Sequence, residues 1–200
     1  MAEMVKLEKL FCQSGSWRWF TRRVVLPWAL QDATPTGNAL EIGAGSGVMG
    51  AQILSTFPAL QLTVTDLDES MLVARRGDLA AFGVRGKVVT ADATHLEFPS
   101  DSFDFVFSFL MLHHVIEWES ALAEAIRVLR PQGELIGYDF LDSWAFRLFH
   151  RIERAEVRLM TLDRLTDVVD ALPVDRVQLT TGFAHSIVRF KVRKAPASSA

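Results

Sequence analysis

The sequence has a single cysteine, Cys12, so no disulfide can form within the chain and no cysteine-based metal cluster can be built. This scarcity gives no sign of an oxidising compartment. A secretory leader is not recognisable either, because residues 1–10 mix acidic and basic side chains and contain no apolar stretch of signal-peptide length. These absences predict a cytoplasmic location.

The chain also lacks a long hydrophobic run and a strong excess of one charge. Its longest apolar stretch, 105–116, is too short to cross a bilayer and is interrupted by Ser108, His113 and His114. The formal net charge is −3 and the basic residues are scattered, so no nucleic-acid partner is expected. With 50% hydrophobic residues, the chain can form one domain that hides about 70% of its unfolded surface.

Glycine is concentrated in one short segment. Residues 39–42 are mostly apolar and lead into glycines at positions 43, 45 and 47, after which apolar residues resume at helical spacing. This order indicates a strand, a tight turn and a helix, in which glycine permits positive φ and lets a ligand approach the backbone. The glycines could equally serve only a sharp turn. Together with position 50 they also satisfy the G-x-G-x-x-G pattern of a dinucleotide site, which keeps a nicotinamide- or flavin-dependent oxidoreductase open.

Strand-like and helix-like segments alternate from residue 39 to residue 138. The expected strands are 39–42, 61–66, 86–91, 103–109 and 133–138, and the expected helices lie near 47–57, 69–82 and 118–130. Repeated strand-then-helix units demand a mostly parallel α/β sheet with helices on both faces. Ligands of such sheets bind at the carboxyl ends of the strands.

The pattern changes after Tyr138. Residues 143–172 indicate a long or broken helical region, and two strand-like segments follow at 176–181 and 185–192. The turn between them is too short for a parallel crossover, so they predict an antiparallel hairpin at the sheet edge. The tail from Ala195 is small and polar, which predicts disorder.

An amphipathic segment precedes the sheet. Residues 4–31 place apolar side chains at helical intervals and predict two helices. The second carries Trp17 and Trp28 among arginines, so it could make a peripheral membrane contact or close over a bound substrate. It could also simply pack against the sheet.

Acidic residues follow the second and third expected strands. The carboxylate of Asp66 could accept both hydroxyl hydrogens of a ribose, and Asp92 with Ala93 could meet an adenine ring and its amine. Each Asp could instead cap the helix or turn that follows it. Three successive strand ends that carry glycines or an acid indicate one shared ligand.

These segments resemble the class I S-adenosylmethionine-dependent methyltransferases, and in particular their small type 11 branch. The resemblance covers roughly residues 38–140 and keeps order and spacing; its segments are 40–47, 64–72, 90–93, 98–106, 112–115 and 127–134. It implies a Rossmann-like seven-stranded sheet, mostly parallel with an antiparallel last strand. Glu134 replaces a glycine that is frequent in the family, a departure that does not touch the pocket.

The resemblance also implies S-adenosylmethionine as the cofactor, with S-adenosylhomocysteine as product. Glu41, Gly43, Ala44 and Gly45 would line the methionine end, Asp66 and Leu67 the ribose and adenine, Met71 an adenine face, Asp92 and Ala93 the adenine edge, and Ser108 would lie near the sulfonium. An oxidoreductase would give no reason for an acid at the third strand end, which weakens that alternative.

The length of the chain and the lack of an internal repeat or a linker predict a single domain over 1–200, which by the resemblance would be a methyltransferase domain. Its parts would be a helical cap (1–37), a cofactor-binding core (38–140), a helical insert with the hairpin (141–194) and a disordered tail (195–200).

Methyl transfer from a sulfonium needs alignment and the exclusion of water, and it needs a base when the acceptor is a hydroxyl, a protonated amine or a carbon acid. His113 and His114 follow the fourth strand, where the acceptor is expected, and imidazole suits proton transfer near neutral pH. Either could instead cap a helix or fill the pocket wall. Tyr138 is a further catalytic candidate, and Asp139 is another unless it only holds a turn.

No histidine or carboxylate spacing predicts a metal, although acids at 139 and 142 keep a divalent-ion-assisted O-methyltransferase open. The acceptor is expected to be a small molecule, O- or N-directed. Aromatic residues among arginines would suit a lipid, a quinone or a polyketide-like compound; they are Trp17, Trp19, Trp28, Trp144, Phe146 and Phe149. A non-catalytic cofactor-binding or scaffold protein on the same fold is the second class of function.

Overall fold

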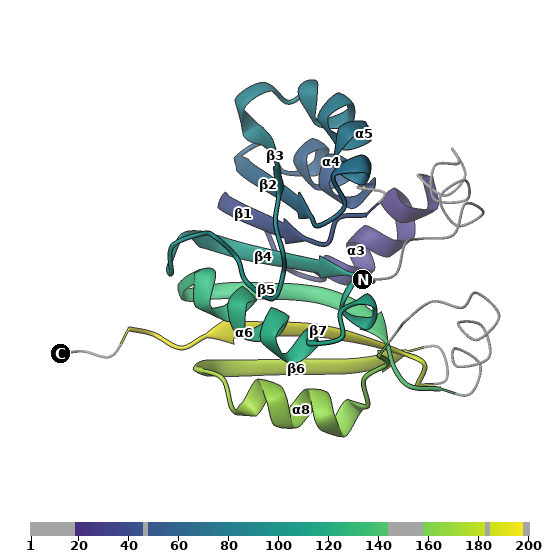
Figure 1. The fold of residues 1–200 in the computed structure, drawn as a ribbon, viewed down its shortest axis with the longest axis vertical. Helices are drawn as coiled ribbons and strands as arrows, with labels where there is room; N and C mark the ends of the chain where they lie inside the picture. Colours follow the sequence, from purple (N-terminus) through teal and green to yellow (C-terminus); the bar gives the residue numbers. More distant parts are fainter. Residues whose placement is uncertain (1–18, 46–47, 144–157, 183–184, 198–200) are drawn as a thin grey trace.

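A seven-stranded sheet forms the centre of the computed structural model, which describes residues 19–45, 48–143, 158–182 and 185–197 (Figure 1). The strands are β1 (Gly37–Ile42), β2 (Leu60–Asp66), β3 (Gly86–Thr90), β4 (Phe103–Phe109), β5 (Leu129–Phe140), β6 (Val174–Gly182) and β7 (Ile187–Lys194). Their order across the sheet is β3-β2-β1-β4-β5-β7-β6.

The first five strands are parallel to one another, whereas β7 is antiparallel to both of its neighbours, β5 and β6. The predicted α/β class, the mostly parallel sheet and the antiparallel last strand are therefore confirmed. The predicted edge hairpin is also present. Although β7 is last in sequence, it lies inside the sheet, and β6 forms the edge.

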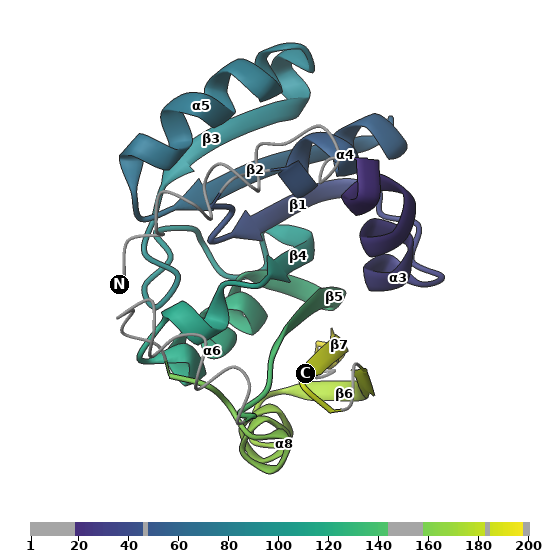
Figure 2. The same cartoon turned by 90° about the vertical axis from the view of Figure 1, so that its right-hand side faces the viewer.

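Helices cover both faces of this sheet (Figure 2). They are η1 (Thr21–Val25), α3 (Leu26–Leu30), α4 (Val48–Thr56), α5 (Glu69–Ala80), η2 (Gly83–Arg85), η3 (Leu112–His114), α6 (Trp118–Val128) and α8 (Leu162–Asp170). Buried residues of α3 and α4, with Leu79 of α5, belong to one hydrophobic cluster, and those of α6 and α8 belong to the other. The sheet thus separates two apolar cores.

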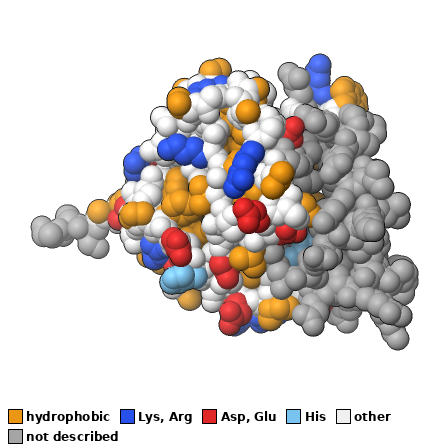
Figure 3. All heavy atoms as spheres, turned by 45° about the horizontal axis from the view of Figure 1, so that its top comes forward, with side chains coloured by type: hydrophobic (Ala, Val, Ile, Leu, Met, Phe, Trp, Pro, Cys, Tyr) orange, Lys and Arg blue, Asp and Glu red, His pale blue; other side chains and the backbone are white. Residues whose placement is uncertain are grey.

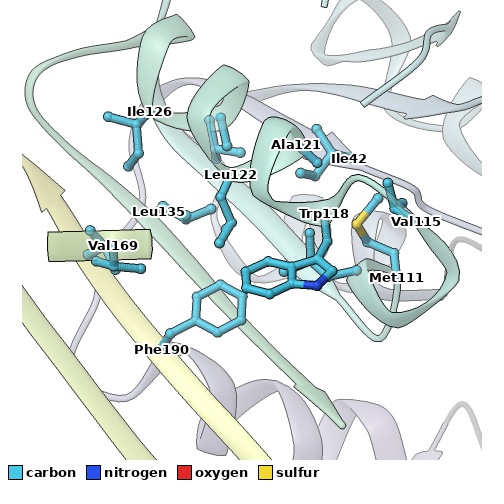
Figure 4. Close-up of a cluster of buried hydrophobic side chains, with 14 of the residues drawn as sticks. Ile42, Met111, Val115, Trp118, Ala121, Leu122, Ile126, Leu135, Val169 and Phe190 are labelled. Carbon is cyan, nitrogen blue, oxygen red and sulfur yellow. The ribbon is translucent and has the colours of Figure 1, made fainter. Parts of the chain in front are cut away.

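The core beneath α6 follows from the spacing of its apolar residues. Trp118, Ala121, Leu122 and Ala125 recur every three or four positions, so they share one helix face, and all four are buried. Figure 4 shows the Trp118 indole beside Phe190 of β7, with Met111 and Leu122 close by.

The opposite core contains a row of aromatic rings. Phe107 stacks with Phe109 at a centroid distance of 5.8 Å; Phe109 contacts Tyr138 at 5.5 Å, and Tyr138 meets Trp28 edge-on at 5.3 Å. Arg189 of β7 lies over the Trp28 ring and donates to the Trp28 carbonyl at 2.7 Å. Burial lowers the pKa of Arg189. These contacts attach α3 to the C-terminal half of the sheet.

Some expected boundaries differ from the observed ones. Strand β5 begins at Leu129 rather than at residue 133, because Leu129 already pairs with Phe103 of β4. Within the expected helical region 143–172, the described part contains α8, and 144–157 lies outside the described residues. The first expected N-terminal helix also lies outside them, whereas η1 and α3 occupy the second.

The described residues include the first part of the C-terminal tail. The N–H of Ala195 donates to the carbonyl of Pro173 at 2.9 Å, so the chain is held up to this point; residues 198–200 lie outside the description. Within the described ranges, no helix is long and apolar enough to span a membrane. The division into cap, core, insert and tail stays a prediction.

Gly137 tests the packing between β4, β5 and β7. A Cβ at this position would overlap the backbone oxygen of Ser108 and would lie 2.5 Å from Cζ of Phe190. We expect Gly137→Ala to lower the free energy of unfolding by about 1–3 kcal/mol, measured by urea denaturation. Gly77→Ala in α5 is the matched control; its Cβ would meet nothing within 4 Å, and stability should rise by about 0.5–1 kcal/mol. Equal stability of Gly137→Ala and wild type would contradict the described packing.

Candidate functional site

The carboxyl ends of four neighbouring strands meet at one edge of the sheet. The pairings that fix this are Ile42 with Ser108 between β1 and β4, Glu41 with Val64 between β1 and β2, and Phe109 with Tyr138 between β4 and β5. Parallel strands in this register place the segments that follow them side by side. The glycine turn, Asp66, the two histidines and Asp139 therefore share this edge.

The glycine turn after β1 adopts a backbone that requires glycine. Gly43 has φ +59° and Gly45 has φ +47°, in the left-handed region. A Cβ on Gly43 would lie 2.6 Å from Cε of Met111, so the turn packs closely against the loop after β4. The N–H of Ala44 donates to the carbonyl of Thr65 at 2.8 Å, which fastens the turn to β2.

The Glu41 side chain is directed toward α4. The residue is only 2% exposed, and its Oε2 lies 2.5 Å from the position that a Cβ on Gly50 of α4 would take. Its backbone carbonyl accepts from Oγ1 of Thr65 at 2.9 Å. Glu41 thus lies beneath the turn, between β1 and α4.

Asp66 connects the glycine turn to the start of α5. Its Oδ2 accepts from the N–H of Gly45 at 2.7 Å, and its Oδ1 accepts from the N–H of Asp68 at 2.9 Å. Asp68, in turn, caps α5 by accepting from Ser70. A carboxylate oxygen has two lone pairs, so Asp66 can accept further hydrogen bonds from a ligand while it holds both turns.

The adenine-side candidates lie next to these strand ends. Leu67 is 45% exposed and Met71 of α5 is half-buried. Asp92 is exposed, and its Oδ1 accepts from both the N–H and the hydroxyl of Thr94, at 2.8 and 2.7 Å. Ala93 packs against the core beneath α6. Through Oδ1, Asp92 therefore stabilises the turn that follows it, which is the alternative role that the sequence allowed.

Ser108 lies inside the protein at the end of β4. It is fully buried, and its hydroxyl has no hydrogen-bond partner among the described residues. It pairs with Ile42 on one side and Gly137 on the other. Buried hydroxyls normally find a partner, so Ser108 is an unusual polar group next to the site.

His113 and Asp139 form a buried pair. The imidazole of His113 is 2% exposed and Asp139 is 0% exposed, and Nδ1 lies 2.5 Å from Oδ1. The carboxylate also accepts from the N–H of Leu112 and of Phe140, both at 2.7 Å. When Nδ1 of the neutral ring donates to the carboxylate, Nε2 is the nitrogen that can take a proton.

The other two catalytic candidates are placed differently. His114 is half-buried, and its ring centroid lies 4.0 Å from that of His113. The ring of Tyr138 packs against Trp28 and Phe109 in the core beneath α3. Successive side chains of a strand point to opposite faces, so Tyr138 is separated from the pair that Asp139 makes. The structure does not bring Tyr138 together with the histidines.

Asp139 is the residue whose role sequence reasoning left undecided. It holds the turn at Leu112, which is one of the roles considered for it, and it also contacts His113; a catalytic role stays a prediction. The sequence signal for Asp139 was that an acid directly follows the expected strand 133–138. In the structure this strand pairs with β4, which precedes the histidines.

The described surroundings of the site do not form a metal centre. No group of three or more His, Cys, Asp or Glu residues within the described ranges could hold a metal ion. Figure 3 shows that acidic and basic side chains both occur among apolar ones on the face it draws. This face therefore carries mixed charge.

Comparisons of sequence identify a domain family. The family model described as a methyltransferase domain matches residues 40–137. The ubiquinone/menaquinone biosynthesis C-methyltransferase UbiE of Cupriavidus pinatubonensis is 33% identical over 129 residues, which are 64% of this chain and 51% of that protein. The chain spans about half the length of the curated relatives it matches.

Solved structures share the fold. A Haemonchus contortus phosphoethanolamine N-methyltransferase in complex with S-adenosylhomocysteine has a TM-score of 0.72 at 17% identity, covering 90% of this chain and 53% of that one. The YcgJ protein of Bacillus subtilis has a TM-score of 0.69 at 16% identity, covering 90% of this chain and 100% of that one. The match assigns residues 40–137 to the methyltransferase domain family, and the sheet of this chain has the fold of the S-adenosylmethionine-dependent class I methyltransferases.

Proposed function

We propose that this protein transfers a methyl group from S-adenosylmethionine to a small molecule. The observation that carries the proposal is the convergence of two features at one sheet edge. The glycine turn that Asp66 holds lies where β1 and β2 end, and the His113–Asp139 pair lies where β4 and β5 end. Family membership supports the donor, and the relatives named UbiE support a small-molecule acceptor.

The residues at the turn fit such a donor. Asp66 retains lone pairs for the ribose hydroxyls, and the exposed side chain of Leu67 offers an apolar surface to the adenine. The left-handed Gly43 and Gly45 keep the turn free of side chains where the methionine end would pass. When bound, S-adenosylmethionine supplies a methyl group activated by the positive charge on its sulfur.

The remaining candidates complete this arrangement. In the proposal, Met71, Asp92 and Ala93 would surround the adenine, and Ser108 would lie near the sulfonium. Glu41 would act from beneath the turn, since its side chain is directed toward α4.

His113 is the base in this mechanism. It takes a proton on Nε2 from an acceptor hydroxyl, protonated amine or carbon acid, and the acceptor atom then bonds to the methyl group as the sulfur leaves. Asp139 keeps the ring in the tautomer that can accept a proton and stabilises the imidazolium that forms. His114 would orient the acceptor beside this ring.

The acceptor is proposed to be an apolar ring compound of the quinone type. The names of the UbiE relatives favour it, and they favour carbon as the accepting atom over the oxygen or nitrogen expected from the sequence. Of the aromatic residues expected to line its site, Trp17, Trp144, Phe146 and Phe149 lie outside the described residues. Trp28 is half-buried and packs against Tyr138, and Trp19 is exposed; their part in lining the acceptor stays a prediction.

A peripheral membrane contact would bring such an acceptor within reach. Trp19, Phe20 and Val24 are 63%, 39% and 46% exposed, respectively. Apolar side chains at a helical N-terminal segment suit an interfacial position. This contact and the cytoplasmic location stay predictions.

Calorimetry with S-adenosylmethionine and S-adenosylhomocysteine tests the donor site. Wild type should bind both, and Asp66→Ala should weaken binding by about 1–3 kcal/mol, because the hydrogen bonds to a charged acceptor are lost. Glu69→Gln is the control, since Glu69 is a nearby acid that is exposed, and its affinity should equal that of wild type. Unchanged affinity of Asp66→Ala would refute the role of Asp66. Wild type that binds neither compound would refute the proposed function.

Turnover with methyl-labelled donor and a panel of hydroquinones tests the base. His113→Asn should lower kcat by about 10²- to 10⁴-fold, the usual contribution of a general base, with unchanged affinity for S-adenosylhomocysteine. His185→Asn is the control, because His185 is an exposed residue that contacts Thr181 in the hairpin. A variant at His113 with wild-type kcat would sink this assignment. Donor binding without turnover of any acceptor would favour the scaffold alternative.

A further inference from the structure

We propose that Arg158 is a positioning residue that holds His113 against Asp139. The inference rests on the proposed function, in which His113 is the base. Arg158 lies outside the matched residues 40–137, yet it contacts the segment that carries the base at two points. Its N–H donates to the carbonyl of His113 at 2.9 Å, and its Nη1 donates to the carbonyl of Ile116 at 2.8 Å.

The guanidinium of Arg158 is itself held by Glu119 in the first turn of α6. Nη1 donates to Oε2 at 2.7 Å and Nη2 donates to Oε1 at 2.8 Å, which is the two-pronged geometry that arginine makes with a carboxylate. The guanidinium also lies 5.8 Å from the ring centroid of the buried Trp118. The position of the Arg158 head group is therefore defined from three sides.

Glu119 remains charged in this arrangement. Its partial burial opposes ionisation, but the hydrogen bonds that it accepts, including those from Arg158, outweigh burial and lower the pKa of Glu119. Arg164 adds a longer contact to the same carboxylate, at 3.4 Å. The charge pair thus persists through the neutral pH range.

The same short segment also reaches the strand that carries Asp139. Met160 pairs with Leu141 in a parallel bridge, and its carbonyl accepts from the N–H of Asp142 at 2.8 Å. Residues 158–160 consequently connect the loop that carries His113 to the end of β5. A displacement of this segment would change the separation of Nδ1 and Oδ1, on which the orientation of the base depends.

Little global stability depends on this ion pair. The Arg158 side chain is 45% exposed, and exposed ion pairs contribute little to folding. The loss of Arg158 should therefore affect the geometry of the base more than the stability of the fold.

The test compares Arg158→Ala and Arg158→Lys with wild type in three readouts. The first is the downfield NMR signal of the His113 Nδ1 proton. The second is hydrogen exchange of the amides of His114 and Val115, which bond within the same loop. The third is the division of any activity loss between kcat and the KM for the donor.

Arg158→Ala should broaden the His113 signal, accelerate exchange of the two amides and lower kcat by roughly 10- to 100-fold, as expected for a misplaced catalytic group, with an unchanged KM for the donor. Both variants keep the main-chain N–H that bonds to His113. Arg158→Lys should recover part of each effect, because it also keeps the positive charge although it loses the fork. Should the alanine variant not fold, the lysine variant decides on the same readouts.

Arg193→Ala is the matched control. Arg193 makes a comparable two-pronged pair with Asp175, at 2.9 and 3.1 Å, near the opposite edge of the sheet. Its removal should leave all three readouts unchanged. A wild-type His113 signal, wild-type exchange and wild-type kcat in Arg158→Ala would overturn the inference. Wild type that binds no donor would refute the proposed function. It would leave the role of Arg158 to be decided by the NMR and exchange readouts, which need no ligand.

Discussion

The parallel register of β1, β2, β4 and β5 is the constraint on which the site depends. It brings four chain segments that are distant in sequence to one edge, where the glycine turn, Asp66, His113 and Asp139 meet. In a strand, a shift of one residue exchanges the two faces. Such a shift in β5 would direct Tyr138 toward His113 and bury Asp139 among the aromatic rings of the other core. The chemistry proposed for this edge therefore requires the sheet to have a single register.

Two acids at this edge hold the chain and also present the groups expected to meet the ligands. Asp66 accepts from the backbone at Gly45 and Asp68, and Asp139 accepts from the backbone at Leu112 and Phe140. Backbone donors fix the position of a carboxylate without the rotamer freedom of a long side chain. Because the same hydrogen bonds fold the turns and orient the carboxylates, the site is shaped before any ligand arrives.

Sequence reasoning reached the sheet because alternation and turn chemistry are local signals. It placed β4 at its observed bounds and anticipated the hairpin of β6 and β7 from the short turn between them. It began the fifth strand too late, because Pro131 and Gln132 resemble a turn. Gln132 indeed has φ +68°. Pairing of Leu129 with Phe103 extends the strand past them.

The details of the site were harder to predict because they depend on pairing between strands. Whether Tyr138 or Asp139 faces His113 is decided by the register of β5 against β4, which a single sequence does not contain. Arg158 carries no motif at all, and its closeness to His113 arises only when the chain returns from the end of β5. Local patterns therefore located the edge, and tertiary contacts selected its working residues.

The position of β7 bears on how the protein forms during synthesis. This strand is made after every other strand, yet it separates β5 from β6. Until it leaves the ribosome, β6 has no partner in the sheet and β5 exposes an open row of backbone donors and acceptors, a surface prone to misassociation. The described sheet therefore cannot close during synthesis until β7 has been made and has inserted between β5 and β6.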